Sequence, residues 1–182
     1  MPSDWREHPK LKGRFLLDHP DDLQVIVHDG GPRTTRTAPE AVWVTVTGIE
    51  GDVFQGRVLN QPHNLQTVRQ GSEIRFMMPV GSEHPVMVTD KYLRERGDWI
   101  IHPCGKCGMS ELFDAPSDLV RVVFPNLPPD GQMSMFTAIC PLCGGIQGVE
   151  SKSVPTGTAD ASAAPGNANK QPWWRFWARL NL

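Results

Sequence analysis

The chain contains four cysteines, which form two Cys-x-x-Cys pairs, and a glycine follows the second cysteine of each pair. The first pair is Cys104 and Cys107, and the second is Cys140 and Cys143. Two intervening residues let both sulfurs of a pair face one point from a tight turn. The glycine permits a positive φ, which turns backbone N–H groups towards the sulfurs. Two such turns supply the four thiolates that Zn²⁺ favours, so the sequence predicts a structural zinc site at these cysteines.

The two pairs resemble the rubredoxin-type knuckles of zinc-ribbon proteins, which have the forms Cys-Gly-x-Cys-Gly and Cys-Pro-x-Cys-Gly. The resemblance implies a ribbon of strands around the metal. The segment between the pairs, residues 108–139, is 32 residues long, whereas about 15–20 are usual. The site is therefore expected to close an inserted loop. Four protein ligands leave no open coordination position, so the zinc is expected to hold structure rather than to catalyse a reaction.

Three other interpretations of the cysteines remain open. They could form two disulfides, one pair could be a redox Cys-x-x-Cys, or iron could take the place of zinc. Residues 1–5 contain no apolar signal region, so we expect a cytoplasmic protein in a reducing compartment, where disulfides are disfavoured. A redox role is disfavoured because there are two pairs and no thioredoxin-like βαβ pattern.

The composition favours short strands and many turns. Among 182 residues there are 17 glycines and 17 prolines, which interrupt long helices. The net charge of −2 gives no broad electrostatic signal for nucleic acid. No apolar run approaches the roughly 20 residues that are needed to span a bilayer. We expect a mainly β (α+β) fold.

Alternating patterns predict a small SH3-like β-barrel in the first half of the chain. Residues 42–47 alternate valines with Trp and Thr, and residues 53–59 return as the second strand of a hairpin. Gly56 predicts a bulge or a sharp bend. Thr89 is expected to cap a helix that extends to residue 96. Further strands are expected at 23–28, 74–78 and 86–88.

Three segments of this half occur together in a known family: Trp43-Val44-x-Val46, the run from Glu50-Gly51-Asp52 to Asn60-Gln61-Pro62, and Gly71-Ser72-Glu73-Ile74. Across residues 41–79 they resemble the YegJ-like family, an uncharacterised bacterial domain of unknown function. The family has no established catalytic residues to assign. Some members lie in loci that resemble toxin–immunity systems, which makes an immunity-type protein that binds and blocks a toxin one alternative function.

The second half of the chain is expected to form the zinc-ribbon hairpin. Strands are predicted at 98–103, before the first knuckle, and at 133–139 and 146–149, on either side of the second knuckle. Residues 110–114 are expected to form a turn of helix. The run 118–124 (DLVRVVF) predicts another strand.

These patterns divide the chain into five parts. An N-terminal extension (1–22) precedes the β-barrel module (23–97) and the zinc-ribbon module (98–150). A flexible linker (151–171) then leads to a Trp/Arg-rich tail (172–182). The linker is almost entirely Ser, Thr, Ala, Gly, Pro, Asn and Lys, a composition that cannot bury a core.

The tail predicts binding to a partner. In a helical conformation Trp173 and Trp177 share one face, while Arg175 and Arg179 share another. Trp and Arg are typical anchors in protein grooves. An anionic membrane surface and the chain's own body are alternative docking sites. The expected binding residues are Trp173, Trp174, Arg175, Phe176, Trp177 and Arg179.

No group of residues predicts catalysis, since Gly-x-Ser-x-Gly, Gly-rich phosphate-loop and His-Glu-x-x-His motifs are missing from the sequence. His28, His63 and His84 lie beside turns and are expected to be solvated. His102 is expected to cap its strand, with metal ligation or a hydrogen bond to a ligand as the alternative. We predict a non-enzymatic, zinc-stabilised bacterial adaptor. An immunity protein and a nucleic-acid-associated zinc ribbon are the alternatives, and a metalloenzyme is disfavoured because the ligand set is closed.

Overall fold

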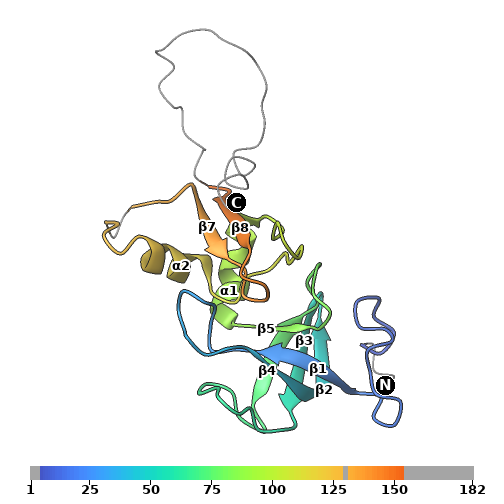
Figure 1. Cartoon of the computed structure of the whole chain (residues 1–182). Coiled ribbons are helices and arrows are strands. Elements are labelled where there is room, and N and C mark those ends of the chain that lie inside the picture. The colour runs from blue at the N-terminus through green and yellow to red at the C-terminus, as the bar shows by residue number, and fades with distance from the viewer. Residues whose placement is uncertain (1–4, 129–130, 154–182) are drawn as a thin grey trace, which may run out of the picture.

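A computed structural model of the chain describes residues 5–128 and 131–153 (Figure 1). Over these ranges the strands form a closed five-stranded barrel and a separate three-stranded sheet. The mainly β fold with a small barrel, predicted from the sequence, is confirmed. The barrel strands are β1 (Asp22–Val27), β2 (Glu40–Glu50), β3 (Val53–Val58), β4 (Glu73–Met77) and β5 (Val86–Val88).

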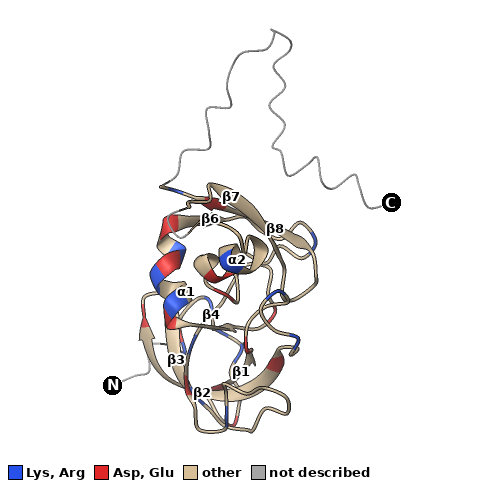
Figure 2. Ribbon diagram, turned by 90° about the vertical axis from the view of Figure 1, so that its left-hand side faces the viewer, with Lys and Arg blue, Asp and Glu red and all other residues tan. Residues whose placement is uncertain are grey.

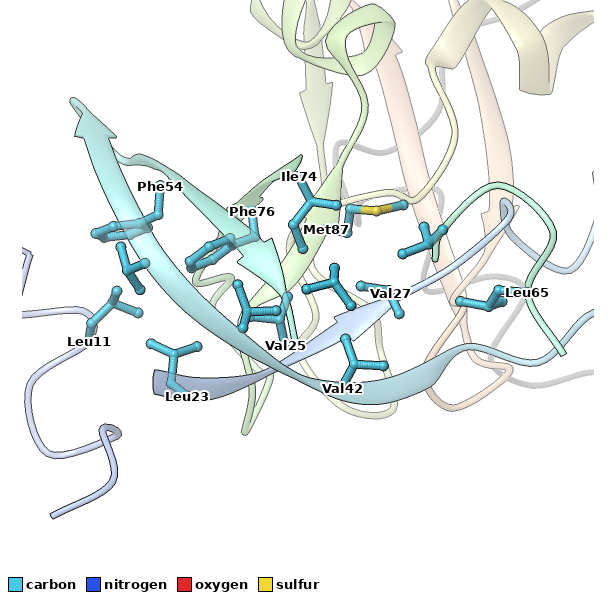
Figure 3. Packing of buried hydrophobic residues seen from close by; sticks show 14 residues of the cluster. Leu11, Leu23, Val25, Val27, Val42, Phe54, Leu65, Ile74, Phe76 and Met87 are labelled. Carbon is cyan, nitrogen blue, oxygen red and sulfur yellow. The ribbon is translucent and has the colours of Figure 1, made fainter. Parts of the chain in front are cut away.

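The barrel is a meander in which each strand pairs antiparallel with the next. A parallel bridge between Ile26 of β1 and Val86 of β5 closes it. Alternation along each strand sends one set of side chains inward. Figure 3 shows these apolar side chains filling the interior, where Phe54 and Phe76 stack with their ring centroids 5.5 Å apart.

Gly56 lies beside a bulge, but the extra residue belongs to the partner strand. The pairing register shifts between Val46 and Gly48 of β2, opposite Gly56 and its neighbour. A Cβ on Gly56 would lie 2.5 Å from Cγ1 of Val44. Gly56 is therefore needed because β2 and β3 approach closely there; the predicted irregularity occurs at this point of the hairpin, with its extra residue in β2.

The remaining elements surround the three-stranded sheet, whose strand order is β6-β8-β7. Thr89 caps the first helix as predicted, since its side chain accepts a hydrogen bond from Tyr92 N at 3.1 Å. In chain order the elements are α1 (Asp90–Glu95), a 3₁₀ turn (Arg96–Asp98), β6 (Trp99–Ile101), α2 (Pro116–Val123), β7 (Met135–Ile139) and β8 (Ile146–Ser151).

Helix α2 corrects two predictions. Residues 118–124 were expected to form a strand, yet most of them belong to this helix. Pro116 occupies the start of α2, where its missing N–H and fixed φ are favourable, and Asp118 lies in the first turn, where its charge suits the helix dipole. The turn of helix expected at 110–114 is irregular backbone.

One hydrophobic cluster, separate from the core inside the barrel, spans the barrel and the three-stranded sheet. Met77 and Val88, from β4 and β5, belong to one cluster with Tyr92 of α1 and Val149 of β8. The packing therefore couples the two sheets. No helix in the described part of the chain is long and apolar enough to cross a membrane.

Candidate metal centre

Each Cys-x-x-Cys pair forms a tight turn with the geometry expected from its sequence. Gly108 N donates to Cys104 O, and Gly144 N donates to Cys140 O, each at 2.9 Å. The two glycines have φ angles of +79° and +72°. These angles suit glycine, because a Cβ is strained in the left-handed region. The two turns are hereafter the first knuckle (104–108) and the second knuckle (140–144).

The two knuckles bring the four sulfurs into one cluster. All four Sγ atoms lie within 4.8 Å of one another. Cys104 Sγ is 3.5 Å from Cys143 Sγ, and Cys107 Sγ is 3.6 Å from Cys140 Sγ. Four thiolates bonded at about 2.3 Å to a tetrahedral metal are roughly 3.8 Å apart. The donor set and its spacing therefore fit one metal ion, which the four cysteines could hold between them.

The two knuckles place the sulfurs in unequal surroundings. Cys104 and Cys140 are buried, whereas Cys107 and Cys143 are half-buried. Burial raises the pKa of the Cys140 and Cys143 thiols. Burial also acts to raise the pKa of Cys104, but the backbone N–H groups of Cys107 and Lys106 outweigh it and lower that pKa to about 7. A bound cation would offset the cost of burying thiolates, because a coordinating thiol loses its proton.

Backbone amides and one lysine supply partial positive charge around the sulfurs. Lys106 N donates to Cys104 Sγ, and Gly145 N donates to Cys143 Sγ, both at 3.4 Å. The ammonium group of Lys106 reaches across to the carbonyl oxygen of Cys143 at 3.3 Å. Four thiolates around a divalent cation have a net negative charge, and these N–H and ammonium groups would stabilise it.

Gly145 determines how closely the two knuckles can approach. A Cβ at this position would lie 2.6 Å from Cys104 Sγ and 2.9 Å from Lys106 Cβ, and both of these atoms belong to the first knuckle. Either contact would push the knuckles apart. The Gly144-Gly145 doublet is the sequence signal for this role, and the second glycine lies outside the Cys-x-x-Cys-Gly pattern.

The barrel supports the first knuckle through the loop between β4 and β5. A Cβ on Gly81 would lie 2.2 Å from the carbonyl carbon of Gly108, so the two backbones are in direct contact. Ser110 N also donates to Val80 O at 3.2 Å. Beneath the knuckles, Val86 of β5 packs in one cluster with Cys104 and Cys140, among others. The sequence around Gly81 gave no sign of this contact.

The other predicted site residues lie elsewhere. His102 is outside the cysteine cluster, and its Nε2 is 3.1 Å from Glu150 Oε2 on β8. This contact joins the residue after β6 to β8 and gives no support to the alternative of metal ligation. The tail residues Trp173, Trp174, Arg175, Phe176, Trp177 and Arg179 lie outside the described residues.

His28 is buried, which contradicts the expectation of a solvated loop histidine. It is 2% exposed, and its ring stacks on Phe113 with centroids 3.9 Å apart. Gly30 N donates to Nδ1 at 3.1 Å, so the ring proton lies on Nε2, which donates to Met87 O at 2.9 Å. Burial lowers the pKa of His28 to about 4. This neutral ring joins the end of β1 to β5 and to Phe113, a neighbour of the metal centre.

Comparison with known proteins found no matching family model, and no curated protein or solved structure is significantly similar to the chain.

Proposed function

We propose that the chain is a zinc-stabilised interaction protein in which the metal holds the fold and the C-terminal tail binds a partner. The observation that carries the metal part of the proposal is the cluster of four cysteine sulfurs within 4.8 Å of one another, and the interaction part rests on the Trp/Arg-rich sequence of the tail. Four thiolates complete the tetrahedral shell of Zn²⁺ and leave no position for an activated water or a substrate. Iron could occupy the same four sulfurs, and elemental analysis of the purified chain distinguishes the two metals.

Charge favours a protein partner over a nucleic acid. Figure 2 shows acidic and basic residues alternating along α1. Its Lys91 forms an ion pair with Asp118 of α2, and Arg96, just after the helix, pairs with Glu111 at 2.7 Å. Positive charges that are already neutralised by neighbouring carboxylates give little attraction for phosphates.

A pull-down with the full chain tests the interaction role. We expect the double variant Trp173→Ser/Trp177→Ser to lose the captured partner, because buried tryptophans contribute much of the affinity at protein interfaces. Leu17→Ser is the matched control, since Leu17 is an apolar residue of the body that is 99% exposed. Recovery of the same proteins with the double variant would exclude the tail as the binding segment. Capture of the full chain by anionic lipid vesicles alone would instead indicate a membrane surface.

A further inference from the structure

An apolar groove lies beside the last described residues of the chain. Its volume is about 560 Å³, within the range of pockets that hold ligands or side chains. Helix α2 and the segment that follows it form one wall, and the start of β6 and the end of β8 form the other. The apolar lining residues are Trp99, Val120, Phe124, Pro125, Leu127, Pro128 and Met133.

The walls of this groove are fixed by the core beneath them. Trp99, Val120, Phe124 and Met133 are half-buried, with their inner sides packed on the shared cluster that contains Leu119. Trp99 makes an edge-to-face contact with Phe136, at a centroid distance of 5.6 Å. The groove is therefore preformed, and it leaves apolar surface uncovered.

The chain itself leaves from the rim of the groove. Ser151 and Ser153 line it, and Ser153 is the last residue described. Figure 1 shows the end of β8 and the segment after α2 together at the pole of the molecule away from the barrel. The residues beyond Ser153 therefore start at the groove and not at a distant face.

We propose that the groove between α2 and the end of β8 is the intramolecular docking site for the chain's own segment Trp173–Trp177. Nineteen residues, 154–172, connect the rim to this segment. Their composition predicts a random coil, for which a chain of that length has a root-mean-square reach of roughly 24 Å, enough to return the segment to the groove.

Because the linker keeps the segment Trp173–Trp177 close to the groove, a low affinity is sufficient to keep it bound there. A short flexible linker gives an effective concentration on the order of 1 mM, so a Kd of about 0.1 mM for the free segment keeps it docked in roughly nine of ten molecules. Trp and Phe side chains match a groove walled by Trp99 and Phe124. A second groove, on the barrel, combines apolar residues with the charged Glu73, Arg75 and Asp90. Among the described residues that line the groove beside α2, Arg121 is the only charged one, so that groove suits the aromatic segment better.

Docking goes beyond the interaction role, because it predicts that the tail covers its own body until a partner displaces it. The two claims can fail separately. If the tail variant loses partner capture while hydrogen exchange of the groove is the same as in the wild type, the interaction role is retained and the proposal that the tail docks in the groove is overturned.

Hydrogen exchange of the full zinc-loaded chain, followed by mass spectrometry, tests the docking. In the wild-type chain the amides of residues 172–182 should exchange about tenfold more slowly than in Val120→Ser, which removes apolar surface from the groove. Val122→Ser is the control, since Val122 lies on the same helix, is 45% exposed and does not line the groove. This control should keep the wild-type rates.

A variant in the tail provides a second test that does not alter α2, since Val120→Ser removes a side chain that also packs on the core. Trp173→Ser/Trp177→Ser changes no residue of the barrel or the three-stranded sheet. It should speed hydrogen exchange in peptides from α2 and from residues 131–135. Equal groove exchange in this variant and in the wild type would overturn the proposal. The protection should also be independent of protein concentration over a 100-fold dilution, and its loss on dilution would show that a second copy occupies the groove instead.

Discussion

At the scale of single residues, the metal centre depends on a glycine without a side chain at position 145 as well as on the four sulfurs. Gly145 has no Cβ in a place where one would lie 2.6 Å from Cys104 Sγ, whereas nothing lies within 4 Å of the corresponding position at Gly105. The two glycines belong to the same metal centre, and they differ in whether a methyl group fits. They therefore form a matched pair for testing the packing of the knuckles.

Gly145→Ala should weaken zinc binding by about 10–100-fold, the range typical for residues that position metal ligands. The added methyl group forces Cys104 away from the tetrahedral position. Competition with a chromophoric chelator measures the affinity. Gly105→Ala should bind zinc as the wild type does, and equal affinities for the two variants would contradict the packing that we describe.

The burial of His28 predicts that the free energy of unfolding depends on pH between about 4 and 6.5. The pKa of His28 is lowered to about 4 by burial, while an unfolded chain has a histidine pKa of about 6.5. Between these values the unfolded state binds more protons, so the free energy of unfolding falls as the pH falls from 6.5 towards 4. From pH 7 to pH 5 this residue should remove about 2 kcal/mol.

Urea unfolding of the zinc-loaded chain at both pH values measures the effect. His28→Gln keeps an N–H donor for Met87 O and has no ionisable ring, so it should lose about 2 kcal/mol less than the wild type on acidification. Any loss from the cysteine ligands is common to both proteins and cancels in the comparison. His63→Gln, which alters an exposed loop histidine, should behave as the wild type.

At the scale of elements, a loop of the barrel and the first knuckle stabilise one another. Gly81 and Gly13 have nearly the same φ, +78° and +79°, but only Gly81 is in contact with another backbone segment. Alanine at Gly13 should cost about 1–2 kcal/mol for the left-handed conformation. Alanine at Gly81 should cost about 1–3 kcal/mol more, because Gly108 must move. Urea unfolding compares the two, and equal costs would mean that the loop does not support the knuckle.

The sequence predicted those elements whose signals are local. The knuckles were recognisable because two intervening residues and a glycine define the turn by themselves. The barrel strands were found from alternation, since one face of each strand must be apolar to fill the barrel. Thr89 was identified as a helix cap because its side chain bonds to a backbone N–H only three residues away.

The failures involve contacts between distant parts of the chain. The valines of α2 are β-branched residues that favour strands, and tertiary packing of Leu119 overrides that preference. His28 follows a strand and precedes a turn, so its burial depends on Phe113, which is far away in sequence. The contact between Gly81 and Gly108 is likewise invisible to any local pattern.

At the scale of the whole molecule, the hydrophobic cluster that spans both sheets predicts that the proposed zinc stabilises the barrel as well as the three-stranded sheet. Binding of structural zinc supplies an apparent 10–16 kcal/mol, which is comparable to the total stability of a domain. Val86 links β5 directly to the cluster that contains Cys104 and Cys140. Removal of the metal should therefore weaken both sheets together.

Stepwise chelation followed by hydrogen exchange tests this coupling. Peptides from β2, in the barrel, and from β7, in the three-stranded sheet, should lose protection at the same chelator concentration. Matched unfolding of the two strands is expected because Met77 and Val88 pack with Val149 in one core. A barrel that stays protected after β7 has opened would show two independent units.

The zinc content of the full chain, purified from cells without added metal, tests the central claim most directly. Elemental analysis should give one zinc per chain, and Cys140→Ser should contain much less and melt at a lower temperature, since the remaining three thiolates leave the shell incomplete. A chain that contains iron in place of zinc would correct the identity of the metal. A stably folded chain that contains no metal, with its four cysteines joined as two disulfides in freshly lysed cells, would contradict the account.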